Sequence, residues 1–550
     1  MGKKDLYKDL DRRINKTISS QKIYAEMKKD LMTFYWTRKD PHIISNIIKE
    51  FTSEGDILFD PFLGSAPILF SLDNSDKNLY LIGSEINEMP ISFINFNLSE
   101  ISISELEYIR RNFLKFYNKH LSLYEYASPI YQEKIVSSKI ILDRNKEGFS
   151  PKKFIFEGNE KLTIDKKDKK FFKKYTSEYQ KRCKNFDQYI EKHDIELIPN
   201  SRIAINEGMK MSDLFNPINF YILTEYSKKF KNEKPMIAIL ASVLHLCRLT
   251  DLKSQSQFPF WIPNKDIVER NILILLKKRI EKVCKEKNNN TLHLDLVKNF
   301  TTLKKSPKGV YILNKPSQFI TKKELPDKSV DLVITDPPYF DQVAYSEYLK
   351  IWEHFCNYKS QLKGELVHSN RKKEPSNKES YLENLYACFS LVAKKLKDDR
   401  LSIIFFKDSK PNNIDLFIRQ MEKCGLKFIR TCHINKRKYT YKQNTTINTT
   451  VGGECLFFFK KSPIRTKRTI SDSSRSNNQI KDEIEKVISS FAKKYFKKNG
   501  EMSLGELYDN GLILHLYEKD LLKYISNSKE VIKILENCFK FSENRKYMIV

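Results

Sequence analysis

The sequence predicts an α/β protein in which a nucleotide-binding sheet carries a large, mainly helical insertion and is followed by a helical C-terminal unit. Three observations predict this fold. Apolar, strand-like runs end in acidic residues near position 60 and again near position 336. The alternation of strand and helix patterns disappears between residues 101 and 308. Helical periodicity with two Asn-Gly turn signals then occupies residues 480–550.

The first half of the predicted sheet starts at Ile57. Apolar residues 57–59 lead into the turn Asp60-Pro61-Phe62-Leu63-Gly64-Ser65, and a helical stretch follows from Ile68 to Leu72. A strand, turn and helix in this order open a nucleotide-binding α/β half, with the ligand beyond the strand ends. A second strand, Leu79–Glu85, ends in a carboxylate roughly 20 residues past the turn, where it can accept both ribose hydroxyls of an adenosine. Taken alone, Glu85 would be read as an ordinary acid at a strand end.

The second half of the sheet contains Asp336-Pro337-Pro338-Tyr339, directly after the apolar run Val330–Thr335. The Asp336 carboxylate and the Pro337 carbonyl can accept both N–H groups of a nucleobase amine, which frees the nitrogen lone pair for attack. The two prolines fix φ and remove competing backbone donors. Tyr339 would stack on a base that has left its helix. The alternative reading is an Asp-Pro-Pro turn after a strand.

The interval 101–308 is the candidate target-recognition region, because it is rich in lysine and aromatic residues. Lys169, Lys170, Lys173 and Lys174 alternate with Phe and Tyr in a pattern that suits phosphate contact and base stacking, although a solvated charged helix would look the same. The chain has 98 Lys and Arg against 69 Asp and Glu, a formal net charge of +29. Such an excess favours a nucleic-acid partner, while an AT-rich coding bias would also enrich lysine.

Length and cysteine usage narrow the class of protein. The 550 residues, 40% of them hydrophobic, are enough for about three domains. The nine cysteines stand singly, so neither a metal site nor a disulfide framework is expected. We expect an intracellular, cytoplasmic protein without membrane contact, because the N-terminus has no apolar signal core and the longest apolar stretch, 235–247, is too short for a bilayer.

Together the two motifs resemble those of the DNA amino-methyltransferases that use S-adenosylmethionine. In that family Asp-Pro-Phe-x-Gly-Ser-Gly marks the cofactor turn and Asp-Pro-Pro-Tyr marks the target-amine site. Residues 34–41 resemble its methionine-binding segment, and residues 401–407 and 453–459 its later core strands. One departure is Ala66-Pro67, where the family has Gly-Thr; the loss of a glycine narrows the conformations of the turn.

This resemblance implies a Rossmann-like, S-adenosylmethionine-dependent methyltransferase sheet. It divides the chain into N-terminal helices with the cofactor-binding half (1–100), the insertion (101–308), the target-amine half (309–461), a linker (462–479) and the C-terminal unit (480–550). It assigns catalysis to Asp336, Pro337, Pro338 and Tyr339. It assigns cofactor binding to Thr37, Asp60, Pro61, Phe62, Gly64, Ser65 and Glu85.

A narrower resemblance links the chain to a subgroup of adenine-specific DNA methylases that carry a zinc ribbon, whose cysteine pairs are missing here. It rests on residues 209–217, 242–246, 260–263, 269–271 and 340–347. The expected reaction is therefore site-specific methylation of adenine N6 in double-stranded DNA. Cytosine N4, an RNA base, and a catalytically silent DNA-binding subunit stay open as alternatives. Restriction–modification or phage defence, with other subunits as partners, is an interpretation from context alone.

Overall fold

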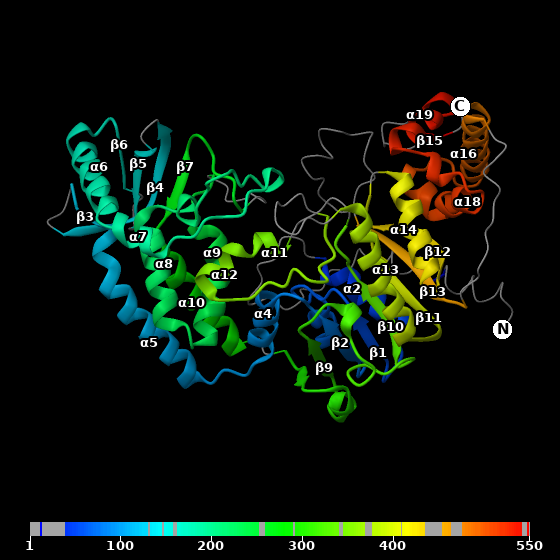
Figure 1. Ribbon diagram of the computed structural model, residues 1–550, viewed down its shortest axis with the longest axis horizontal. Helices are drawn as coiled ribbons and strands as arrows, with labels where there is room; N and C mark the ends of the chain where they lie inside the picture. The colour runs from blue at the N-terminus through cyan, green and yellow to red at the C-terminus, as the bar shows by residue number, and fades with distance from the viewer. Residues whose placement is uncertain are drawn as a thin grey trace.

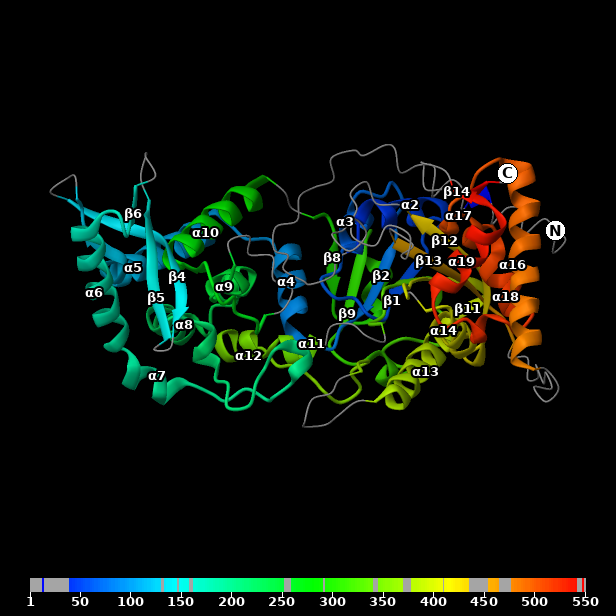
Figure 2. The same ribbon diagram turned by 90° about the horizontal axis from the view of Figure 1, so that it is seen from above.

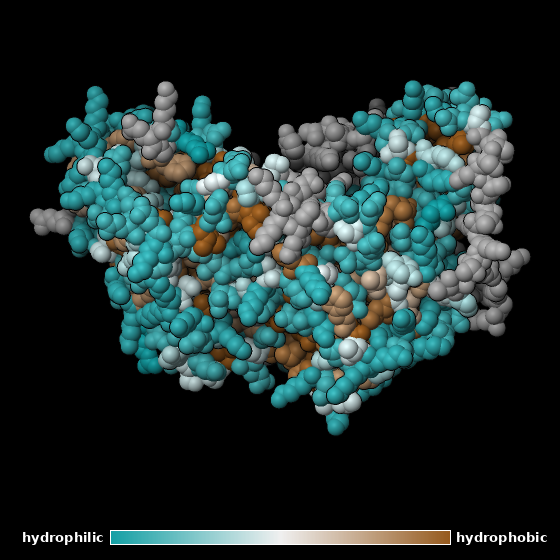
Figure 3. Space-filling view, viewed as in Figure 1, coloured by the Kyte–Doolittle hydropathy of each residue, from teal (hydrophilic) through white to brown (hydrophobic). Residues whose placement is uncertain are grey.

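The computed structural model describes residues 12–13, 39–129, 133–145, 148–157, 162–251, 259–289, 292–339, 345–368, 377–408, 410–434, 454–463, 476–541 and 547–548. These residues form two lobes that lie side by side (Figure 1). One lobe is built on a large sheet and carries the C-terminal helices, and the other is formed by the insertion. The surface is hollowed between the lobes, and most of the face shown in Figure 3 is hydrophilic.

The main sheet has eight strands in the order β12-β13-β11-β10-β1-β2-β9-β8. Its neighbours from β8 to β11 are parallel, and β13 runs antiparallel to both β11 and β12. Chain order reverses at β1, which lies between β2 and β10, and such a switch point is where open α/β sheets bind ligands. The strands are β1 Ile57–Asp60, β2 Tyr80–Ser84, β8 Asp295–Val297, β9 Gly309–Leu313, β10 Val330–Thr335, β11 Leu396–Phe405, β12 Leu426–Ile434 and β13 Glu454–Lys461.

Helices cover both faces of this sheet, which explains why its central strands are apolar runs and not alternating ones. Every residue of β1 and of β10 is buried. Leu58 packs with the helices α2 (Pro41–Phe51) and α3 (Ile68–Asp73), whereas its neighbour Phe59 packs on the opposite face with α13 (Lys378–Lys395) and α14 (Pro411–Lys423). The predicted mixed α/β architecture with a largely parallel sheet is confirmed.

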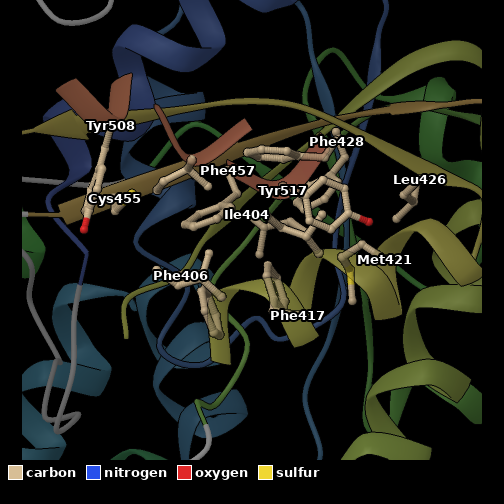
Figure 4. Packing of buried hydrophobic residues seen from close by; sticks show 14 of the residues in the cluster. Ile404, Phe406, Phe417, Met421, Leu426, Phe428, Cys455, Phe457, Tyr508 and Tyr517 are labelled. Carbon is tan, nitrogen blue, oxygen red and sulfur yellow. The ribbon is translucent and has the colours of Figure 1, made fainter. Parts of the chain in front are cut away.

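The C-terminal unit shares the core of the sheet lobe. Its helices contribute to the same buried cluster as Phe417, Phe428 and Phe457 of the sheet and α14. Figure 4 shows Tyr517 close to Phe428, and Tyr508 beside Cys455. The unit consists of α16 Asn477–Asn499, α17 Leu504–Leu507, the π-helical turn Tyr508–Leu512, α18 Ile513–Glu518, α19 Ser528–Cys538 and the strand pair β14 Lys540–Phe541 and β15 Tyr547–Met548. Most of the predicted linker lies outside the described residues, and α16 starts within its last part.

The insertion contains a sheet that the sequence pattern did not reveal. Its helices are α5 Ile103–His120, α6 Lys169–Lys184, α7 Asp187–His193, α8 Pro217–Phe230, α9 Lys234–Cys247 and α10 Ile272–Asn289. The additional antiparallel sheet is formed by β3 Glu125–Ala127, β4 Lys134–Asn145, β5 Gly148–Phe156, β6 Thr163–Asp165 and β7 Ile267–Arg270. Its long strands carry many charged residues on their exposed positions, and β4 pairs with β7, which is far away in sequence. The sequence of these strands therefore has no regular apolar alternation from which the insertion sheet could be predicted.

The borders of the insertion also differ from those expected at 101 and 308. Strand β8 already pairs with β9 in the main sheet. In the other direction, α12 (Lys350–Cys356), which follows the Asp-Pro-Pro-Tyr motif, packs Ile351 and Trp352 into the insertion core. No helix in the described part of the chain is long and apolar enough to cross a membrane.

Candidate active site

The two sequence motifs meet at the carboxyl edge of the main sheet. Strands β1 and β10 are parallel neighbours with Phe59 opposite Val333, so their chain ends leave the sheet together. The Thr335 hydroxyl donates a hydrogen bond of 2.6 Å to Asp60 Oδ1 across this junction. A cavity of about 950 Å³, part of it open to solvent, lies beyond these ends. Its lining includes Asp60, Pro61, Phe62, Gly64, Ser65, Glu85, Asp336 and Pro338.

Two of the expected catalytic residues, Pro337 and Tyr339, are not part of the described lining, and Tyr339 is only 7% exposed. The expected cofactor-binding residue Thr37 lies outside the described residues. Within the described chain, no cluster of His, Cys, Asp and Glu side chains is placed to hold a metal ion.

The turn after β1 is fixed against the end of β2. Its Leu63 amide donates to the Ser84 carbonyl at 2.9 Å, and its Gly64 amide donates to Glu85 Oε2 at 2.9 Å. Glu85 Oε1 accepts from the Asn87 amide at 2.8 Å. Leu63 can lie this close only because position 83 is glycine, since a Cβ there would come within 2.5 Å of a Leu63 methyl carbon. The Glu85 carboxylate is therefore held in one orientation at the cavity wall.

Ala66 completes this turn in a left-handed conformation, with φ of 53°. An L-residue with a Cβ pays about 1–2 kcal/mol for such a backbone, whereas glycine does not. The alanine that departs from the family pattern thus occupies a position where glycine would be favoured. Pro67 is the N-cap of α3, and the helix itself begins at Ile68. The turn forms with this sequence, at a cost in conformational energy.

Two buried carboxylates give the cofactor side an unusual electrostatic character. Burial raises the pKa of Asp60 to about 7, opposed by its hydrogen bonds from Thr335 and Phe62. Burial likewise raises the pKa of Glu85 to about 7, opposed by the amides of Asn87 and Gly64. Both groups therefore titrate near neutral pH, where a ligand that donates hydrogen bonds favours the ionised form.

Two further polar atoms at the cavity have no hydrogen-bond partner among the described residues. They are Ser65 Oγ and Asn87 Oδ1, and both residues are at least 95% buried. Buried polar atoms are nearly always satisfied, so such a pair indicates a place for a polar ligand. Together with the Glu85 carboxylate and apolar neighbours such as Phe62 and Ile86, this lining fits an adenosine-bearing cofactor.

On the target side, Asp336 has both carboxylate oxygens engaged. Oδ1 accepts the Tyr339 hydroxyl at 2.6 Å, and Oδ2 lies 3.1 Å from the Lys39 ammonium nitrogen. Lys39 Nζ also donates to the Tyr339 hydroxyl at 3.2 Å. The Tyr339 ring packs edge-on against Phe406, with ring centroids 5.3 Å apart. From α13, the Tyr381 hydroxyl donates to the Pro338 carbonyl at 2.7 Å and fixes the motif from behind.

Sequence reasoning did not find Lys39 or Tyr381. Lys39 is 300 residues away from Tyr339 along the chain, and Tyr381 reads as one more core aromatic of a helix. Lys39 precedes the N-cap of α2, where Asp40 accepts from the His42 amide. That cap directs the chain towards the sheet edge, but its contact with the motif arises only from the tertiary fold.

The predicted nucleic-acid contacts lie far from the cavity. Lys169, Lys170, Lys173 and Lys174 are exposed on α6, which Figures 1 and 2 place at the end of the insertion lobe opposite the main sheet. The aromatic residues between and after them are turned inward: Tyr175 and Tyr179 are buried in the core of the insertion sheet. These two rings are therefore unavailable for stacking on bases, whereas the lysines remain open to solvent.

A largely parallel sheet with a ligand cavity at its carboxyl edge is consistent with a methyltransferase fold. Residues 330–540 match the family model N6_N4_Mtase, described as DNA methylase. The match starts at β10 and extends through most of the C-terminal unit, which agrees with the shared core of these parts. A search of curated proteins finds no match. Residues 330–540 are thus similar to the DNA methylases of the N6/N4 type, a family that methylates base amines with S-adenosylmethionine.

Proposed function

We propose that this chain is a site-specific methyltransferase that moves the methyl group of S-adenosylmethionine to N6 of an adenine flipped out of double-stranded DNA. One observation carries the proposal. Glu85 from the cofactor half and Asp336 from the target half line one cavity at the switch point of the sheet. A donor of methyl groups and an acceptor amine can therefore be held side by side, and such positioning supplies much of the rate.

The cofactor would be held by the turn after β1 and by the end of β2. The Glu85 carboxylate accepts the ribose hydroxyls, and Ser65 Oγ and Asn87 Oδ1 are the further polar atoms that a cofactor can satisfy. The bound cofactor supplies an electrophilic methyl group on a sulfonium. Asp60, Pro61, Phe62 and Gly64 shape the wall around it. A role for Thr37 at the methionine end rests on the family resemblance alone.

The target amine would be held by Asp336 and by the Pro337 carbonyl. Tyr339 and Lys39 each engage one Asp336 oxygen, and the amine would use the remaining acceptor capacity of this carboxylate or replace one of these donors. Two acceptors on the N–H groups draw the nitrogen towards tetrahedral geometry, so its lone pair can attack the methyl carbon in line. The nitrogen loses a proton afterwards. Stacking of the base on Tyr339 requires the ring to become more exposed than the present 7%.

Two features support adenine in DNA as the substrate. The motif is Asp-Pro-Pro-Tyr, and the insertion resembles that of adenine-specific methylases in residues 209–217, 260–263 and 269–271. The net charge of +29 suits a long polyanion, and the exposed lysines of α6 would contact phosphates away from the flipped base. Specific recognition would then belong to the insertion lobe.

The experiment that tests this proposal replaces the residue that touches the amine. We expect Asp336→Ala to abolish methyl transfer to DNA, because the variant lacks the carboxylate acceptor, while calorimetry still detects S-adenosylmethionine binding. Asp295→Ala, on an exposed position of β8, serves as the matched control and should transfer methyl groups normally. Normal turnover by Asp336→Ala would contradict the assignment, and loss of cofactor binding by the wild-type chain would favour a silent subunit.

A further inference from the structure

The single helical turn α11, Tyr345–Tyr348, connects the cavity with the insertion lobe. Tyr345 lines the cavity. Ser346 donates from its amide to Glu365 Oε1 at 3.0 Å and from its hydroxyl to Glu365 Oε2 at 2.6 Å. Glu365 also lines the cavity, so two successive residues of α11 determine part of its wall.

The other two residues of α11 face the insertion. Glu347 Oε2 accepts a hydrogen bond of 2.5 Å from Asn200 Nδ2. The Tyr348 ring contacts Phe260 with centroids 6.4 Å apart, and Tyr348 belongs to the insertion core. The chain then continues into α12, where Trp352 Nε1 donates to the Ala241 carbonyl at 2.8 Å. One turn of helix is thus tied to both lobes.

Asn200 belongs to an arm, residues 195–211, that extends from the insertion between α7 and α8 towards α11 (Figure 2). The arm folds back on itself, because Glu196 pairs with Lys210 and Asn200 pairs with Ile205 through isolated backbone bridges. It is anchored by apolar side chains in the insertion core, namely Leu197, Ile203, Ile205 and Met211. The arm therefore moves with the insertion lobe as a packed structure.

The contact between the arm and α11 is buried, which gives it a large influence on local order. Asn200 is 3% exposed and Glu347 is 8% exposed. A buried carboxylate or amide that loses a hydrogen-bond partner destabilises the folded arrangement, because its desolvation is no longer compensated. A displaced arm consequently destabilises the present position of α11, and with it the wall formed by Tyr345 and Glu365.

We propose that Asn200 and Glu347 are positioning residues that couple the insertion lobe to the target-amine side of the cavity. This inference rests on the proposed function, because the lobe is taken to bind DNA. With the contact intact, α11 holds Tyr345 and Glu365 in the arrangement that receives the flipped base. With it broken, DNA and cofactor still bind, and the methyl-transfer step slows. The position of the insertion lobe is thereby transmitted to the wall of the cavity.

A double-mutant cycle tests this coupling through the rate of a single turnover. Glu347→Ala and Asn200→Asp should each slow methyl transfer about tenfold or more, the first by removing the acceptor and the second by facing two carboxylates. Glu347→Gln keeps an acceptor for Asn200 and should stay within about threefold of wild type. Asn200→Asp combined with Glu347→Gln restores a donor and an acceptor in exchanged positions, so it should recover most of the rate lost in Asn200→Asp.

The same variants separate a positioning role from a merely structural one. Positioning predicts slow turnover with dissociation constants for S-adenosylmethionine and for duplex DNA within about threefold of wild type. Wild-type rates in Glu347→Ala and Asn200→Asp would overturn the inference. So would losses that follow the melting temperature of each variant and are not rescued in the double variant.

A second measurement keeps the inference testable without catalysis. In the cofactor-bound wild type, duplex DNA should slow hydrogen exchange of the α11 amides, including that of Ser346, and Asn200→Asp should lose this effect. Unchanged exchange in the wild type on addition of DNA would overturn the coupling. DNA-dependent protection in a chain that transfers no methyl group would instead contradict the proposed function and leave the coupling supported.

Discussion

Single residues at the sheet edge combine burial with ionisation near neutral pH. Burial raises the pKa of Glu85 to about 7 in the folded chain, from the ordinary value of 4.5 for a glutamate side chain. To accept ribose hydroxyls the carboxylate has to be ionised, so a protonated Glu85 must lose its proton when the cofactor binds. Cofactor affinity is therefore linked to pH.

We predict that S-adenosylmethionine affinity rises between about pH 6 and pH 8 and falls about tenfold for each pH unit well below the pKa of Glu85. Calorimetric titrations across this range measure the effect. The Glu85→Gln variant has no titrating group at position 85. It should bind S-adenosylmethionine weakly, and its affinity should depend less on pH than that of the wild type. An affinity of the wild type that is constant over the whole range would contradict the ribose role.

The same residues make folding stability depend on pH in a defined direction. Burial raises the pKa values of Asp60 and Glu85 to about 7, from the ordinary values of 3.8 for aspartate and 4.5 for glutamate. The folded state thus holds these protons more tightly than the unfolded state. Their stabilising contribution is complete below about pH 4 and is lost progressively as the pH rises to about 7. A bound cofactor that donates to Glu85 would offset this loss.

At the residue scale, the sequence predicted site residues that belong to a local motif. It did not predict contacts that only the tertiary fold brings together. Asp60, Gly64 and Glu85 could be predicted as neighbours because a strand, a turn and an acidic strand end have a known spatial relation. The Lys39 contact with Asp336 could not, because it joins positions separated by more than half of the length of the chain. The buried Asn87 and Ser65 atoms likewise became evident only in three dimensions.

At the scale of elements, the cofactor turn shows how one residue can cost stability without changing the fold. Ala66 has φ of 53°, in the left-handed region. We predict that Ala66→Gly raises the free energy of unfolding by about 0.5–1 kcal/mol, because relief of backbone strain exceeds the added entropy of the unfolded chain. Denaturant unfolding measures the difference.

A control for this substitution comes from an ordinary helical alanine. Ala393 lies in α13 and is 6% exposed. Ala393→Gly should lower the free energy of unfolding by about 1 kcal/mol, since glycine disfavours a helix interior. If Ala66→Gly destabilised the chain as much as Ala393→Gly does, the strain attributed to the turn would be refuted.

Strands that are continuous apolar runs could be predicted from the sequence, whereas strands with many charged residues on exposed positions could not. The strands β1 and β10 are continuous apolar runs, which is typical of a sheet covered on both faces. In contrast, β4 and β5 carry Lys and Arg on their exposed positions, and β4 gains one of its partners, β7, from a distant segment. The lysines of α6 lie on exposed positions of a helix, and the aromatic residues Tyr175 and Tyr179 of this helix belong to the core of the insertion sheet.

At the scale of the whole molecule, the C-terminal unit and the sheet behave as one folded body. Asp509 of the π-helical turn joins the two. Its carboxylate accepts from the His433 amide and from His433 Nδ1, both at 2.6 Å, and from the Thr431 hydroxyl at 3.2 Å. Arg419 of α14 adds ion pairs with Asp415 and Asp520. The match of the methylase family to residues 330–540 covers strands β10 to β13 of this sheet and most of the C-terminal unit.

We predict that Asp509→Ala destabilises the complete chain by about 1–3 kcal/mol, because it leaves buried donors of β12 without their acceptors. Thermal unfolding should show a lower transition temperature for the sheet lobe and the C-terminal unit together. Asp482→Ala, on an exposed position of α16, is the control and should change little. Loss of the C-terminal helices alone, with the sheet unaffected, would contradict a shared core.

The proposed methylation of adenine N6 in DNA is tested most directly by chemical analysis of the bases. DNA from cells that express the chain would be digested, its modified nucleosides identified, and their positions mapped, with cells that express Asp336→Ala as the reference. We predict N6-methyladenine in one sequence context in DNA from cells that express the wild-type chain, and its absence from cells that express Asp336→Ala. N4-methylcytosine alone would contradict the choice of base. Unmodified DNA together with newly methylated RNA would contradict the claim itself.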